Sequence, residues 1–150
     1  MTTDEEYEDL QRYAKLDPIV RRAADKYFAN MFELQELWKQ LVKEQSSSRQ
    51  HKDQLWGLCQ NGMELAWKWL DAEQMAIPGL TPPRNLPCYT RAIMLLEKEG
   101  RFGQAIVLCD QALHWTPNSE WYIKKKNSLA AAIFSSFKLE AVSVLSEQKK

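Results

Sequence analysis

Three cysteines and two histidines are the residues of this chain best suited to metal binding or nucleophilic chemistry. Cys59, Cys88 and Cys109 are far apart in the sequence, and no Cys-x-x-Cys pair occurs among them. Zinc sites normally use closely spaced ligands, and His51 and His114 do not supply them. We therefore interpret the cysteines as reduced thiols that fill gaps between helices, with no metal or cofactor. A metal site or a thiol nucleophile is the alternative.

Acids and bases show no catalytic spacing either. The chain contains no Walker loop, G-x-G-x-x-G, H-E-x-x-H or nucleophile-elbow motif. Glu97 and Glu99 are two residues apart and would point in different directions on a helix, so they make a poor acid–base pair. The sequence thus favours a non-enzymatic protein.

A basic cluster, Lys124, Lys125 and Lys126, comes one helical turn after Trp121 and Tyr122. The lysines could meet phosphates while the aromatic rings stack on bases, which defines a nucleic-acid-associated regulator as the alternative function. The other interpretation is the solvated face of a terminal helix with the aromatic residues packed beneath it. Because 20 basic and 20 acidic residues cancel, the whole chain has no electrostatic attraction for nucleic acid.

Composition and length are those of a globular domain. Apolar residues make up 45% and charged residues 27% of the 150 residues, enough for one domain with a core and short for two. No apolar run is long enough to span a membrane, and the first ten residues are acidic, unlike a signal peptide. We expect a cytoplasmic protein that does not bind membranes.

The elements that must position these residues are all expected to be helices, about six in number, so we predict an all-α fold. Asp17-Pro18 has the form of a helix start, and the helix from 18 to 45 carries an apolar seam with alternating spacings of four and three. A core helix packed on several neighbours and a dimeric coiled coil are both compatible with this seam. Its members are Val20, Ala24, Tyr27, Met31, Leu34, Trp38 and Leu41.

Residues 45–53 are polar and rich in serine and predict a loop, with Asp53 capping a helix that ends near Ala76. Gly57 and Gly62 weaken this helix, and a close approach by another helix would explain them.

The same helix is rich in tryptophan. Trp67 must point away from Trp69, so at least one indole is expected at a rim or an interface. Self-association through the helix around Trp56, Trp67 and Trp69 would cover them.

Prolines at 78, 82, 83 and 87 interrupt the helical pattern. We interpret residues 78–87 as a stiff connector between an N-terminal helical hairpin region, 1–77, and a C-terminal unit, 88–150, within one compact domain. A helix from about Leu86 to Glu99 is expected to end at Gly100.

A second helix, from about Gly103 to Trp115, should then end at Thr116-Pro117. With so short a turn between them, these two helices must pack antiparallel. A third helix begins near Asn118.

This segment resembles the tetratricopeptide repeat over about 34 residues, the length of one repeat. The matching residues are Tyr89, Leu96, Gly100, Phe102, Ala105, Ala112 and Pro117. We expect the five of them other than Gly100 and Pro117 to be buried. The resemblance implies a right-handed α–α superhelix in which the N-terminal region forms a divergent hairpin and the last helix a cap. Repeats cannot bury their faces alone, so neighbours on both sides are required. The layout is also similar to small bacterial and phage proteins with one such repeat near the C-terminus.

The family binds peptides or helices of other proteins along the face made by its first helices. Transferred by position, that face comprises Thr90, Arg91, Met94, Glu97 and Lys98. Arg91 would pair with a partner carboxylate and Met94 would offer an adaptable apolar contact. The resemblance thus implies an adaptor that captures a segment of a partner protein. The alternative is that these residues are simply the exposed face of one helix.

Overall fold

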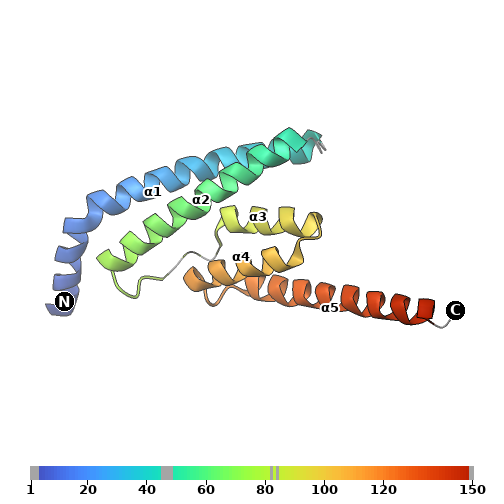
Figure 1. Ribbon diagram of the computed structural model, residues 1–150. Helices are drawn as coiled ribbons and strands as arrows, with labels where there is room; N and C mark the ends of the chain where they lie inside the picture. The colour runs from blue at the N-terminus through green and yellow to red at the C-terminus, as the bar shows by residue number, and fades with distance from the viewer. Residues whose placement is uncertain (1–3, 45–48, 82, 84, 149–150) are drawn as a thin grey trace. The chain divides into compact units, whose positions relative to one another are not determined.

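The described residues of the computed structural model form five α-helices (Figure 1). The structure describes the backbone of residues 4–44, 49–81, 83 and 85–148, and the side chains of 18–43, 49–81, 83 and 85–137. Within these residues no strand occurs, which confirms the predicted all-α class. The helices are α1 (Asp4–Glu44), α2 (Arg49–Ala76), α3 (Pro87–Lys98), α4 (Phe102–Trp115) and α5 (Glu120–Gln148).

Two predicted boundaries are wrong. The helix expected to begin at Asp17-Pro18 instead runs through it, and Pro18 lies inside α1. Proline removes one backbone hydrogen bond and its ring crowds the carbonyl four residues earlier, which can kink a helix without ending it. Asp53 was expected to cap a helix, but α2 already begins at Arg49, four residues earlier.

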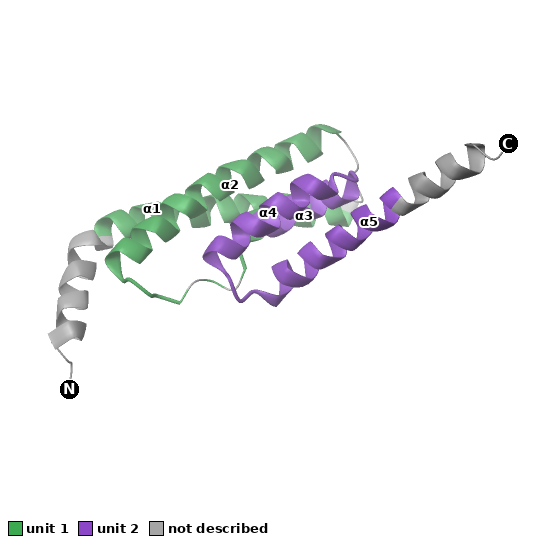
Figure 2. Ribbon diagram, turned by 60° about the horizontal axis from the view of Figure 1, so that its bottom comes forward, with its two compact units in different colours: residues 1–88 green, residues 89–150 purple. Residues whose placement is uncertain are grey.

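The chain divides into two compact units, residues 1–88 and 89–150, and each is described by itself (Figure 2). In unit 1 the long helices α1 and α2 pack against each other. Every residue of the predicted seam is buried or partly buried. Tyr27 stacks on Trp69 with ring centroids 4.9 Å apart, while Trp67 is exposed. The prediction that Trp67 and Trp69 point apart is therefore confirmed.

Gly62 marks the closest approach in unit 1. A Cβ built on it would lie 2.7 Å from Nδ2 of Asn30 in α1 and 2.8 Å from Cβ of Cys88 in the first turn of α3. The same Asn30 amide donates a hydrogen bond to the carbonyl oxygen of Leu58, 2.9 Å away. Only glycine fits here, as the sequence suggested. Gly57 is different, since a Cβ there would meet nothing within 4 Å.

Unit 2 contains α3 from Tyr89, α4 and α5. Gly100 has φ +78°, the left-handed conformation expected of a residue that ends a helix, and Arg101 N–H donates to the carbonyl oxygen of Leu96 at 2.8 Å. The chain reverses there and again after α4, where Thr116 N–H donates to the carbonyl oxygen of Ala112.

The core of unit 2 follows the prediction closely. Of the five residues expected to be buried, only Phe102 is not, because it is half-exposed at the start of α4. The other four are Tyr89, Leu96, Ala105 and Ala112. Tyr122 and Leu129 of α5 are buried with them.

Candidate protein-binding surfaces

The five predicted partner-binding residues of α3 do not share one surface. Thr90 is 8% exposed, and its hydroxyl lies 3.1 Å from the hydroxyl of Tyr122 in α5. A hydrogen bond between two buried hydroxyls satisfies both polar groups inside unit 2. Thr90 therefore contributes to packing between α3 and α5.

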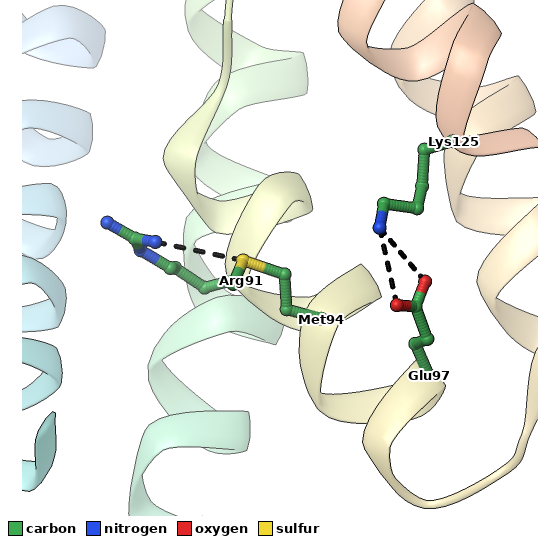
Figure 3. Close-up of polar contacts among 4 residues, drawn as sticks. All are labelled: Arg91, Met94, Glu97 and Lys125. Carbon is green, nitrogen blue, oxygen red and sulfur yellow. Dashed lines mark hydrogen bonds and ion pairs between the residues drawn. The ribbon is translucent and has the colours of Figure 1, made fainter.

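Glu97 also turns toward α5. Its carboxylate lies 3.1 Å from the ammonium group of Lys125 (Figure 3), and that ammonium group is 5.5 Å from the ring centroid of Trp121. Both partners are partly shielded from solvent, so this pair is screened less than an exposed one.

Arg91 and Met94 lie on the other side of α3. The guanidinium Nη1 of Arg91 is 3.8 Å from the sulfur of Met94, and Figure 3 shows both side chains directed away from Lys125. Lys98 is exposed. At about 100° per residue, Lys98 falls between Arg91 and Met94 around the helix, whereas Thr90 and Glu97 fall together about a quarter turn away. The structure thus groups Arg91, Met94 and Lys98 as one face.

The predicted phosphate-binding lysines each have a carboxylate nearby. Lys124 lies 3.8 Å from Glu120 and Lys126 lies 2.6 Å from Asp110, while Lys125 has Glu97. Tyr122 is fully buried, so of the two neighbouring aromatic residues only Trp121 has an exposed ring. Lys125 and Lys126 are thus compensated and attract phosphate weakly, since counterion release depends on uncompensated cations. The pair of Lys124 and Glu120 is largely exposed, so its mutual attraction is weak.

The three cysteines are in no disulfide bond and are buried. Burial raises the pKa of Cys109 to about 11, and the neighbouring Asp110 carboxylate adds to the rise. Because the thiolate is the nucleophile and the metal ligand, this thiol is poorly suited to either role near neutral pH. In the described part of the chain no three His, Cys, Asp or Glu side chains gather in a way that could hold a metal ion.

An open groove of about 1040 Å³ runs between α1 and α2, and we did not predict it. Leu37 and Leu58 contribute apolar surface, Phe32 stands at the edge with 67% of its surface exposed, and Gly57 leaves open space on the α2 side. Two features of the sequence could have indicated the groove. Gly57 lies in a helix although no close packing inside the protein requires a glycine there, and Phe32 is a large apolar residue outside the predicted seam.

Charge along the groove changes sign. Glu33 and Glu36 line it toward the N-terminal side of α1, and Lys39 and Lys43 line it one to two turns further on. Glu36 and Lys39 are 3.7 Å apart and largely exposed, so their mutual attraction is weak and either can turn to another partner. The groove therefore has an acidic end and a basic end.

Comparison with known proteins adds no relative. No family model matches the chain, and neither a curated protein nor a solved structure is significantly similar to it. None of the helices, searched over the described residues, has the length and apolar character needed to cross a membrane.

Proposed function

We propose that this chain is a non-enzymatic interaction module that holds a helical segment of another protein. The groove of unit 1 carries the proposal, because it combines the apolar side chains of Leu37 and Leu58, an exposed phenylalanine and a glycine with open space around it. Binding surfaces for helices are grooves of this kind, lined by apolar side chains and flanked by charge.

The chemistry of the groove specifies its occupant. A third helix packs naturally between two antiparallel helices, with its side-chain ridges in their groove. The absence of a side chain at Gly57 lets the backbone of that helix approach closely. Because a helix N-terminus carries partial positive charge and its C-terminus partial negative charge, the occupant fits with its N-terminal end beside Glu33 and Glu36. Its C-terminal end then lies beside Lys39 and Lys43.

The face of Arg91, Met94 and Lys98 is the second surface in this proposal. A guanidinium next to a thioether suits a segment that offers a carboxylate beside an apolar side chain. We also propose that α3 and α4 form a tetratricopeptide-like hairpin. The left-handed Gly100 and the fully buried Ala105 and Ala112 support this, because small residues let the two helices approach closely.

Gly57→Phe tests the groove. The open space at Gly57 allows the fold to accept the ring, which then occupies the groove. Gly103→Phe is the matched control, since Gly103 is also a helical glycine with open space, but in α4. Each tagged protein is used, after nuclease treatment, to isolate partners from the native host. The strongest recovered protein is then made recombinantly and titrated against each variant.

The proposal predicts a protein that binds the unaltered chain and Gly103→Phe alike. It should bind Gly57→Phe at least about 30-fold more weakly, as expected when a bulky ring blocks the centre of the binding site. If Arg91→Glu abolished binding of this protein and Gly57→Phe did not, the binding site would be on α3 and not in the groove. Recovery of nothing but nuclease-sensitive nucleic acid would overturn the proposal in favour of the lysine cluster, and binding would then fall steeply with salt.

A further inference from the structure

An exposed part of α5 lacks charge on every side. From Asn127 to Phe137 the sequence NSLAAAIFSSF contains no charged residue, although 27% of the chain is charged. Leu129 is buried and Ala132 partly buried, and the other nine side chains are exposed. A helix surrounded by water normally carries charges on its outer face, so this composition is that of a helix packed against another.

The large apolar side chains of this segment form one stripe. Phe134 and Phe137 are 72% and 73% exposed, and Ile123 and Ile133 are exposed on the same side. Positions 123, 130 and 137 are seven residues apart, and 133 and 134 lie beside them on the helix. This is the spacing of a seam between two packed helices. Tyr122 and Leu129, which pack inside unit 2, point more than about 100° away from Phe134 around the helix, and Ile133 lies at the edge of the stripe next to this buried side.

We propose that this stripe pairs with the same stripe of a second copy of the chain, with the two α5 helices antiparallel. A register that places Ala130 opposite Phe137 of the second copy also places Ile133 opposite Phe134. Each phenylalanine at 137 then packs on a small alanine, and the residues around the two-fold axis between the copies are apolar. Such a pairing is isologous and closes as a dimer. It goes beyond the proposed capture of a partner, because it uses neither the groove nor the α3 face.

Repulsion between like charges disfavours the parallel sense. A parallel pair would bring Lys124, Lys125 and Lys126 beside their own copies, whereas an antiparallel pair separates the two clusters. Opposed helix dipoles favour the same arrangement.

The area available predicts a weak dimer. A phenylalanine side chain buries about 150–250 Å², so the four exposed rings of a dimer account for roughly 430–720 Å². Stable interfaces bury about 1,200–2,000 Å² in total, and the isoleucines and alanines supply only part of the difference. We therefore expect association that reverses on dilution.

Sedimentation equilibrium of the full chain over a wide concentration range tests the dimer. The unaltered chain should associate, and Phe134→Glu with Phe137→Glu should raise the dimer dissociation constant roughly 100-fold or more by burying charges at the centre. Val107→Glu is the control, because Val107 is also an exposed apolar residue, 54% exposed, but lies on α4. Circular dichroism checks that helicity is unchanged. A chain that stays monomeric throughout, or a double variant that associates normally, would overturn the proposal.

Cross-linking tests the direction. Ile133→Cys lies beside the proposed axis and should form an intermolecular disulfide under mild oxidation. Ile123→Cys should not, because antiparallel helices hold the two copies of position 123 roughly 30 Å apart. The native thiols are buried, so the unaltered chain gives the background. Efficient cross-linking at 123 would contradict the antiparallel pairing.

Discussion

The hairpin of α1 and α2 and the hairpin of α3 and α4 bury their residues in the same register. In the first helices, Tyr27 and Leu34 match Tyr89 and Leu96, each 62 residues later, and all four are buried. In the second helices the matches are 50 residues apart. They are Leu55 with Ala105, Cys59 with Cys109 and Gly62 with Ala112.

The hairpins differ in length between these matched positions. From Leu34 to Leu55 is 21 residues, whereas from Leu96 to Ala105 is nine. Twelve extra residues therefore lengthen the arms of the first hairpin and leave its packing register intact. Most of the groove lies on these longer arms, since Glu36, Leu37 and Gln54 all fall within the added length. A shared packing pattern thus coexists with a groove on the longer arms of the first hairpin.

Leu55→Ala gives the largest expected effect. Leu55 is fully buried, so its truncation leaves a cavity that should lower the free energy of unfolding by about 2–5 kcal/mol. Urea denaturation followed by circular dichroism measures the change. If the loss is below about 1 kcal/mol, Leu55 is not a core position equivalent to Ala105.

Gly62→Ala tests the close approach that distinguishes α2 from α4. Although alanine is the better helix former, the added Cβ meets Asn30 and Cys88, so we expect a loss of about 1–3 kcal/mol. Gly57→Ala is the control in the same helix. With open space around it, that change should stabilise the protein by about 0.5–1 kcal/mol. If both substitutions changed the free energy of unfolding equally, the packing around Gly62 would not explain its effect on stability.

Ala105→Leu makes the second hairpin resemble the first at one position. Ala105 is fully buried, so the larger side chain should overpack unit 2 and cost about 1–3 kcal/mol in the same assay. An unchanged urea midpoint would mean that α3 and α4 leave room there, contrary to a tetratricopeptide-like crossing.

Glu73→Gln should give the smallest effect, and one that depends on pH. Burial raises the pKa of Glu73, partly offset by a hydrogen bond from Trp69. An acid with a raised folded-state pKa loses its stabilising contribution as the pH rises through that value. The variant should therefore gain stability relative to the unaltered chain near pH 7 and lose this advantage below pH 4.5. Thermal unfolding midpoints of both proteins at pH 7 and at pH 4 measure this. A difference between variant and unaltered chain that is the same at both pH values would contradict the prediction.

The sequence predicted the helices of unit 2 better than those of unit 1 because of local punctuation. Gly100 and Pro117 end helices through backbone constraints that operate wherever they occur. Pro18 and Asp53 carry equally clear local signals, but both lie inside helices. A proline can kink a helix without ending it, and a residue that can cap a helix can also lie within one.

The surfaces were harder to predict than the core. The position of Thr90 on α3 suggested exposure, but its burial depends on a hydroxyl 32 residues away on Tyr122. The groove likewise requires two helices to be laid side by side before Phe32 and Gly57 come together. Neither contact has a signature in the spacing of residues along one helix.

The buried thiols provide a separate kinetic reporter for each hairpin. Cys59 lies in the middle of α2 and Cys109 in the middle of α4, and both are completely inaccessible in the folded chain. A thiol-specific reagent can reach them only when the surrounding helices open, so the labelling rate at each cysteine measures the opening equilibrium of its own unit. Mass spectrometry of the labelled peptides would show whether the long and short hairpins open together or independently.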